Sequence, residues 1–366
     1  MQLIYLSPVS WSSFNQRPHQ FVMWFHGKTG GNVLWIDPYP TRFPLISDFH
    51  RLGSQDSGVN HTIPSWLRVI RPSALVIEPI PASGLINAFL WRSLLRDIDI
   101  FNHQKHTLLA IGKPSVLALT IMRRLKKVKS VYDAMDNFPA FYSGVSRLAL
   151  SWREREIVRH VNCLITSSTL LMQRWRNIRK DVRLVHNGFD AQVLPAPISR
   201  VIKREKKILG YVGTIGHWFD WDWVISLSKV RPMDVVRLIG PVFAHASSVL
   251  PENVELLPQC GHRDALRAMQ DFDIGLIPFK KNDLTASVDP IKYYEYRALG
   301  LPVISTDFGE MKFRGEDKGT FLSHEPQDIN TLVRKALLYR TDNETIGQFI
   351  ASNTWEARFA RANIIP

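Results

Sequence analysis

Lys292 and Glu295 are the two side chains whose types and spacing best suit nucleotide binding. They follow Pro290, which fits the start of a helix because its missing N–H would have no partner there, and Gly300 is a natural helix end. The first turn of such a helix has free N–H groups and a partial positive charge, so with the Lys292 ammonium it would attract a diphosphate. Glu295 lies three residues on, on the same face, and could accept hydrogen bonds from ribose hydroxyls. Periodicity alone also fits a plain amphipathic helix with both side chains in solvent.

A second candidate phosphate contact is the turn that contains Gly213, Thr214 and Gly216, directly after an apolar run that begins at Ile208. Glycines have no Cβ, so the backbone N–H groups of this turn could approach a phosphate closely. A lone Gly-x-x-Gly pattern otherwise predicts only a tight turn. Its position after a strand favours the phosphate interpretation.

Apolar runs alternate with helical patterns along the whole chain, which is typical of parallel α/β layers. In the first half we expect strands at Leu3–Leu6, Val33–Ile36, Leu75–Ile77, Thr107–Ile111, Ser130–Tyr132, Cys163–Thr166 and Val182–Val185. The helical stretches between them are Gln16–His26, Gly84–Arg96, Pro114–Lys126, Arg147–His160 and Thr169–Arg176. In the second half, strands are expected at Ile208–Gly213, Val235–Ile239, Val254–Leu256, Ile274–Ile277 and Pro302–Ser305.

This alternation predicts an α/β protein of two doubly wound, Rossmann-like domains with a cleft between them, where ligands would bind beyond the carboxyl ends of the strands. We expect an N-terminal domain at 1–190, a linker rich in proline and charge at 191–207, and a second domain at 208–345. A C-terminal helix in 346–366 is expected to pack back towards the first domain.

A chain of 366 residues exceeds one ordinary core, which predicts two domains, and its hydrophobic and charged fractions are those of a globular protein. The two isolated cysteines, Cys163 and Cys260, indicate neither a disulfide framework nor a zinc site and favour a reducing cytoplasm. The first residues read as a strand rather than a signal peptide. No window approaches the roughly 18 apolar residues of a membrane span.

The positive charge is concentrated in the first half of the chain. Residues 1–190 carry 24 Lys and Arg against 12 Asp and Glu, whereas residues 191–366 carry 22 against 21. A field this one-sided should attract an anionic partner such as nucleic acid, acidic lipid or a phosphorylated acceptor. A generally basic set of host proteins is the alternative, but it would spread the charge evenly.

The stretch from Asp289 to Thr306, with the pattern Pro-x-Lys-x-x-Glu-Tyr-x-Ala-x-Gly-x-Pro-Val-Ile-Ser-Thr, resembles the donor-site signature of GT-B glycosyltransferases of the glycosyl transferases group 1 type. The glycine turn in Gly210–Gly216 and the runs within 253–279 resemble the same family, as does the segment His186–Asp190. Val131–Asn137 is similar to an element of its bacterial polysaccharide-assembly members. The pieces are specific jointly rather than singly.

The resemblance implies a nucleotide-sugar donor, with uridine favoured over guanosine as its base, and no other cofactor. The implied donor contacts are Gly213, Thr214, Gly216, Pro290, Ile291, Lys292 and Glu295. Many retaining relatives have a further Glu eight residues before the one that matches Glu295, and here that position is Ser287. This departure favours an inverting enzyme resembling the xanthan-type glucuronosyltransferases.

Inverting transfer needs a general base near the acceptor hydroxyl. Asp133 and Asp136 follow the expected strand Ser130–Tyr132, and Asp136 matches the family's acid best by placement. Asp133 could instead orient the loop, and an Asx turn or a helix cap is the alternative for both. His19 follows the first strand and is the third candidate, with a surface helix position as its alternative.

No metal site is predicted. Three Asp-x-Asp sequences occur, at Asp97–Asp99, Asp220–Asp222 and Asp271–Asp273, and so many copies in one chain indicate chance. The resembled family uses a helix start and basic side chains in place of a bound metal.

Basic and aromatic residues mix in Trp91–Arg96 and Arg174–Arg176, and Arg123–Lys129 is the densest basic run. Such segments suit an anionic membrane interface or single-stranded nucleic acid. The resemblance favours the membrane, because acceptors in such pathways are commonly polyprenyl-diphosphate-linked sugars.

The sequence thus predicts a cytoplasmic glycosyltransferase of bacterial surface-glycan assembly, peripheral to the inner face of the cell membrane. Its N-terminal domain would bind a lipid-linked or oligosaccharide acceptor and an anionic membrane, and no nucleic acid. The alternatives are a nucleotide-sugar epimerase or phosphorylase of the same fold, or a nucleic-acid-binding protein that uses the basic first half.

Overall fold

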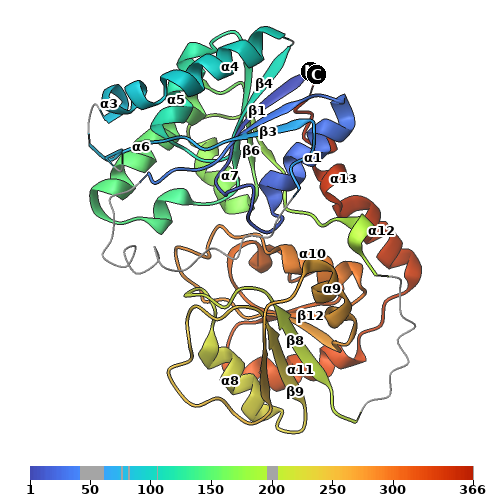
Figure 1. Cartoon of the computed structure of the whole chain (residues 1–366). Coiled ribbons are helices and arrows are strands. Elements are labelled where there is room, and N and C mark those ends of the chain that lie inside the picture. Colours follow the sequence, from blue (N-terminus) through green and yellow to red (C-terminus); the bar gives the residue numbers. More distant parts are fainter. Residues whose placement is uncertain (42–61, 76, 81–82, 105, 196–204, 366) are drawn as a thin grey trace. The chain divides into compact units, whose positions relative to one another are not determined.

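The computed structural model describes residues 1–41, 62–75, 77–80, 83–104, 106–195 and 205–365, which form two compact units (Figure 1). Unit 1 comprises Met1–Val185 with Phe359–Pro366, and unit 2 comprises His186–Arg358. The boundary therefore falls slightly before residue 190. Most of the expected linker lies outside the described residues.

Unit 1 is built on a seven-stranded, all-parallel sheet with the order β3-β2-β1-β4-β5-β6-β7. Its strands are β1 (Gln2–Leu6), β2 (Val33–Ile36), β3 (Leu67–Ile70), β4 (Thr107–Ile111), β5 (Lys129–Ala134), β6 (Cys163–Thr166) and β7 (Val182–Leu184). Every residue of β1 and of β4 is buried, as expected for central strands covered on both faces. The order reverses between these two strands, so their carboxyl ends form the switch point of the sheet.

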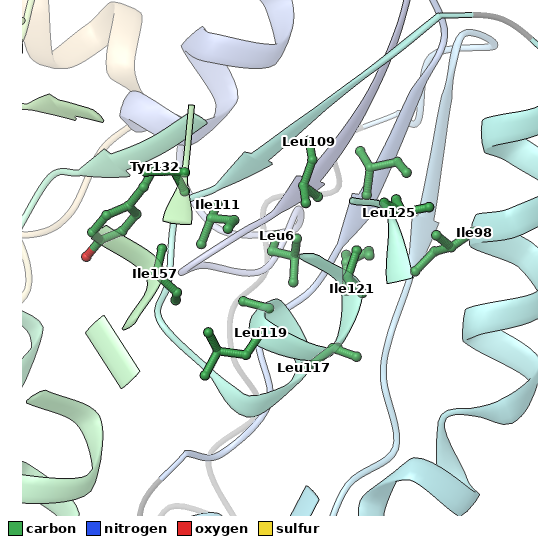
Figure 2. Packing of buried hydrophobic residues seen from close by; sticks show 14 of the residues in the cluster. Leu6, Ile98, Leu109, Ile111, Leu117, Leu119, Ile121, Leu125, Tyr132 and Ile157 are labelled. Atoms are coloured by element: carbon green, nitrogen blue, oxygen red, sulfur yellow. The ribbon is translucent and has the colours of Figure 1, made fainter. Parts of the chain in front are cut away.

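Helices connect the strands of unit 1 and cover its sheet. They are α1 (Arg17–Thr29), α3 (Ser83–Leu90), α4 (Arg92–Gln104), α5 (Val116–Arg124), the 3-10 turn η1 (Phe138–Phe141), α6 (Gly144–His160) and α7 (Thr169–Arg176). Figure 2 shows side chains of α4, α5 and α6 packed against the sheet, among them Ile98, Ile121 and Ile157. The last residues of the chain belong to this unit, and Phe359 packs against Phe21 and Trp24.

The prediction of a strand at Leu75–Ile77 is wrong. The third strand is Leu67–Ile70, which pairs in parallel with β2. The backbone of Leu75 is bonded to a side chain instead, since its N–H donates to Asn87 Oδ1 at 2.8 Å and its carbonyl accepts from Asn87 Nδ2 at 3.3 Å. An apolar run alone did not reveal that competing partner.

The single helix expected at Gly84–Arg96 is two helices, α3 and α4, that meet at Trp91. Trp91 is fully buried, and so is Trp175 on α7. The expectation that these tryptophans lie at a membrane interface is therefore wrong. Both indoles belong to the core that covers one face of the sheet, where burial of their large apolar surface contributes more than exposure would.

Unit 2 has a six-stranded, all-parallel sheet with the order β10-β9-β8-β11-β12-β13. Its strands are β8 (Ile208–Val212), β9 (Val235–Ile239), β10 (Val254–Leu257), β11 (Ile274–Ile277), β12 (Val303–Thr306) and β13 (Thr320–Ser323). The edge strand β13 has no counterpart among the strands expected from the sequence. The order reverses between β8 and β11, which places the switch point of this sheet at their carboxyl ends.

The helices of unit 2 are α8 (Trp221–Val230), α9 (His262–Gln270), α10 (Ile291–Ala298), α11 (Ile329–Leu338) and α12 (Asn343–Asn353), with 3-10 turns η2 (Ala191–Val193), η3 (Gly309–Phe313) and η4 (Pro326–Asp328). The last helix, α13 (Trp355–Arg361), begins in unit 2 and ends in unit 1. In the described parts of the chain, no helix is long and apolar enough to cross a membrane.

Candidate functional site

The amino end of α10 lies at the carboxyl edge of the unit 2 sheet, because this helix connects the parallel neighbours β11 and β12. Pro290 is the N-cap, with φ −76° and ψ 121°, rather than the first helical residue expected from the sequence. Among the described residues, no side chain caps this end. The amides at the start of the helix, including that of Ile291, therefore suit an anionic ligand.

Glu295 is buried in α10 and contacts two basic side chains. Lys292 Nζ donates to its Oε2 at 2.6 Å, and His262 Nε2 lies 2.7 Å from its Oε1. Burial by itself would raise the pKa of the Glu295 carboxyl, but Lys292 and His262 outweigh it and hold the pKa below its ordinary value. The reading of α10 as a helix with Lys292 and Glu295 in solvent is thus wrong for Glu295, which is only 3% exposed.

His262 is the residue at this site that sequence reasoning missed. It is the first residue of α9 and lies far from Glu295 in the chain. No local motif surrounds it, so only the tertiary structure brings the imidazole to the carboxylate.

The glycine turn follows β8, the strand beside β11, at the same edge of the sheet. Gly213 has φ +152°, and a Cβ there would lie 2.8 Å from the Tyr211 hydroxyl, so the position requires glycine. The N–H of Gly213 donates to Ile239 O and that of Ile215 to Pro241 O, each at 2.9 Å.

Thr214 and Gly216 alternate with Gly213 and Ile215 along the turn. Within the described residues, their amides have no hydrogen bond to the protein. These two N–H groups are therefore the phosphate-binding candidates of the turn.

Asp289, directly before Pro290, fixes the approach to α10. Its carboxylate is fully buried and accepts from Asn187 N at 2.7 Å, from the Tyr294 hydroxyl at 2.8 Å and from Arg314 Nη2 at 2.8 Å. Asn187 Nδ2 also donates to the Asp289 carbonyl at 2.6 Å. The motif His186–Asp190 thus belongs to unit 2, where it supports the helix start. Ser287 is buried in the same approach.

Asp136 lies just beyond the carboxyl end of β5 in unit 1 and is half-buried. Burial raises the pKa of its carboxyl to about 7, with Asp133 adding to the rise and Arg17 opposing it. A carboxyl with that pKa changes its protonation state near neutral pH. This is the property expected of a general base.

Asp133 is held by a buried ion pair. Both of its carboxylate oxygens accept from Arg17 Nε, at 3.0 and 2.9 Å, and Arg17 Nη1 donates to Val185 O at 2.8 Å. The side chain is fully buried. Proton transfer to Asp133 would break this pair, so the geometry favours an orienting role.

His19 is 1% exposed and lies in the core of unit 1. Its Nδ1 accepts from Gln16 N at 3.3 Å, and its Nε2 is 3.2 Å from Trp11 O, so Nε2 carries the proton. The ring packs against Trp11 and Trp35. These contacts give His19 a structural part at the start of α1 and leave it the weakest of the three base candidates.

The loop that carries Asp136 is anchored on both sides. Ser167 Oγ donates to Met135 O at 2.7 Å, and Arg174 Nη1 donates to Asn137 Oδ1 at 2.7 Å. Arg174 is held in turn by Glu154, whose Oε2 accepts from its Nη2 at 2.9 Å. Burial raises the pKa of Glu154 to about 7 despite Arg174.

A small depression lies at the switch point of the unit 1 sheet. Its walls include Ser7 after β1, Asp37 and Tyr39 after β2, and Lys113 and Ser115 after β4. Lys113 Nζ donates to Tyr39 O at 3.3 Å, so the ammonium lies at this edge. The hydroxyls along it bond within the protein, since Ser7 Oγ donates to Val9 O and Ser115 Oγ accepts from Ala118 N.

No family model matches the sequence. The chain is similar to a Bacillus subtilis protein, TuaH, whose name proposes it as a glycosyltransferase of teichuronic acid biosynthesis. The two are 25% identical over 198 residues, which is 48% of this chain and 50% of TuaH. The chain thus matches about half the length of this curated relative.

Several solved structures resemble the whole chain in fold. Sucrose-phosphate synthase from Thermosynechococcus elongatus superposes with a TM-score of 0.69 at 14% identity, covering 99% of this chain and 97% of that one. A trehalose-6-phosphate synthase studied for glycosyl transfer with retention gives a TM-score of 0.58 at 11% identity over 100% of both chains. The chain has the GT-B fold. Both Rossmann-like sheets predicted from the sequence are thereby confirmed.

Proposed function

We propose that this chain is a glycosyltransferase that takes a sugar from a nucleoside-diphosphate sugar, with uridine as the base, and passes it to an acceptor hydroxyl. One observation carries the proposal. At the switch point of the unit 2 sheet, the glycine turn after β8 and the uncapped start of α10 after β11 share one edge, beside Lys292 and the buried Glu295. The GT-B fold and the similarity to TuaH support it.

In this proposal the unit 2 edge binds the donor diphosphate. The amides of Thr214, Gly216 and Ile291 and the Lys292 ammonium offset the charge that develops on the departing diphosphate. Glu295 accepts hydrogen bonds from ribose hydroxyls. No bound metal takes part in the proposed step.

Asp136 is the proposed general base and would take the proton of the acceptor hydroxyl as it attacks the anomeric carbon. A protein base of this kind fits inversion, as does Ser287 in the place of a second Glu. The solved trehalose-6-phosphate synthase was studied for transfer with retention, which is the opposite stereochemical outcome. The anomeric configuration of the product, read by NMR, tests inversion directly, and a retained configuration would remove Asp136 from the role of base.

The proposed acceptor is a lipid-linked or polysaccharide glycan of a bacterial surface polymer. The name of TuaH supports the polymer, and the basic first half supports an anionic acceptor. A cytoplasmic location, peripheral to the inner face of the membrane, belongs to the same proposal.

A nucleotide-sugar panel tests the function. Thermal shift identifies the donor, because a ligand that binds only the folded form raises the apparent stability. Release of nucleoside diphosphate is then measured with and without acceptor, and we expect it to require the acceptor. Release that requires inorganic phosphate would establish a phosphorylase, and an isomerised nucleotide sugar an epimerase. Either result would overturn the proposal, as would donor-independent, salt-sensitive binding of nucleic acid in gel shifts.

A further inference from the structure

Helix α3 of unit 1 buries its polar side chains and exposes its apolar ones. Its eight residues carry no charge, and the side chains that it buries are Ser83 and Asn87. The residues that it exposes are Leu85 (79%), Ile86 (55%), Phe89 (65%) and Leu90 (40%). A surface helix of a water-soluble domain normally has the opposite arrangement.

Hydrogen bonds fix this orientation. Ser83 Oγ donates to Glu78 O at 3.1 Å, and the Asn87 amide bonds both backbone groups of Leu75. Rotating the helix to bury its apolar side would leave these buried polar groups without their partners, which is unfavourable. The outward apolar face is therefore built into the fold.

A second exposed apolar stripe runs from η1 into α6. Val145 (62%), Leu148 (72%) and Trp152 (56%) follow one another at spacings of three and four residues, so they share one side of α6, and Phe141 (52%) is exposed on η1 just before the helix. Arg155 continues the same stripe and is exposed. The inward side of α6 carries Leu150 and Ile157.

The helices that carry the two stripes are close to each other in unit 1. Helix α5 packs against both α3 and α6 (Figure 1). The carbonyl of Glu78 accepts a hydrogen bond from Ser83 of α3 and another from the buried Arg153 of α6. Glu78 thus forms hydrogen bonds with both helices. We call the eight exposed apolar side chains on α3, η1 and α6 the apolar face.

The charge around the apolar face is positive. Arg92 lies over the Phe89 ring at 4.4 Å, and Arg96, Arg147 and Arg155 are exposed nearby on the same helices or on α4. Neither α3 nor the first turn of α6 contains an acidic residue. The acids of α4 are engaged, Asp97 with Arg68 and Asp99 with Arg124.

We propose that the apolar face inserts into the headgroup region of an anionic lipid bilayer, with the surrounding arginines on lipid phosphates. Apolar side chains rimmed by arginine suit such an interface, because basic residues near the surface are attracted to anionic headgroups. A second copy of the chain is the less suitable partner, because a symmetric contact would bring the two arginine rims together. The face also lies close in sequence to the proposed base, since η1 begins two residues after Asp136.

Vesicle co-sedimentation of the full chain tests the inference. Vesicles contain phosphatidylcholine alone or with phosphatidylglycerol. We expect binding to the anionic vesicles, and a loss of about tenfold or more in Leu85→Ser/Phe89→Ser and in Leu148→Ser/Trp152→Ser. The control is Met233→Ser/Val249→Ser, which removes side chains of unit 2 that are 74% and 94% exposed. It should bind like the unchanged chain.

Substitution of arginines tests the charged part of the surface separately from the apolar part. Arg147→Gln/Arg155→Gln should weaken binding to anionic vesicles and make what remains less sensitive to salt. Circular dichroism and thermal unfolding verify that each variant is folded. Equal binding by the apolar variants and the control would overturn the inference. So would a dimer in solution that only the apolar substitutions dissociate, which would assign the face to a second copy.

The vesicle measurement contains no sugar donor. An absence of vesicle binding would therefore leave the proposed sugar transfer untouched. An absence of sugar transfer would likewise leave the proposed lipid binding untouched.

Discussion

Lys292 Nζ lies 2.6 Å from Glu295 Oε2, so the side chain that we assign to the donor phosphate and the one that we assign to the ribose form an ion pair with each other. His262 shares the same carboxylate. A ligand that draws Lys292 towards its phosphates leaves His262 as the partner that keeps Glu295 ionised. The three side chains therefore act as one unit, and substitutions at any of them should affect donor binding.

Replacement of Lys292 by alanine should lower kcat/KM by about 100-fold or more, because a charge that stabilises the departing diphosphate is lost. Steady-state transfer with the donor found by thermal shift provides the measurement. Lys335→Ala on α11, where the lysine is exposed, is the matched control and should retain full activity. Equal activity of the two variants would remove Lys292 from the donor site.

Glu295→Gln and His262→Ala should differ in their effects on donor affinity. Loss of the carboxylate removes the acceptor for ribose hydroxyls, so Glu295→Gln should weaken binding about tenfold or more. His262→Ala leaves Lys292 on the carboxylate and should weaken binding less. Isothermal titration calorimetry with the nucleoside diphosphate measures both, and a larger effect at His262 would contradict the assigned roles.

The pH dependence of transfer should follow Asp136. Only the carboxylate can accept a proton, and burial raises its pKa to about 7, so kcat/KM should rise as pH increases through 7 and then level off. Asp136→Asn should lower activity by about 100- to 10,000-fold and abolish this rise. An unchanged pH profile in the remaining activity of the variant would show that another group titrates.

The same raised pKa has a consequence for stability. Between the ordinary pKa of an aspartate and about 7, the unfolded chain loses the proton while folded Asp136 keeps it, so stability falls as pH rises through that window. Asp136→Asn does not ionise and should therefore unfold at a higher temperature than the unchanged chain at pH 8. The difference should shrink towards pH 4. Thermal unfolding followed by circular dichroism at both pH values tests this sign.

Asp289 and Arg314 form a buried pair that supports the start of α10. Arg314→Met would leave the Asp289 carboxylate buried without that charge, and we expect a loss of roughly 3–5 kcal/mol in the free energy of unfolding of unit 2. Denaturant unfolding measures the loss. Arg334→Met on α11, an exposed arginine, is the control and should change stability by no more than about 0.5 kcal/mol. A loss that small at Arg314 would argue against the support that we assign to this pair.

Local sequence patterns determine where most of the strands and helices of this protein form. Most strand positions, the turn at Gly213 and the helix that starts after Pro290 follow from short-range preferences that the sequence alone displays. A buried parallel strand is recognisable because it is apolar throughout, and a helix start because few residues fit it. The two-sheet α/β architecture was predictable for the same reason.

Tertiary structure decided which side chains meet. His262 reaches Glu295, Asn187 reaches Asp289 and Arg17 reaches Asp133 across 33, 102 and 116 residues of chain, and no local pattern encodes such pairs. Trp91 is in the core, and α3 turns its apolar side outward because Asn87 bonds Leu75. Propensity fixes where an element forms, whereas its orientation depends on which distant groups satisfy its polar atoms.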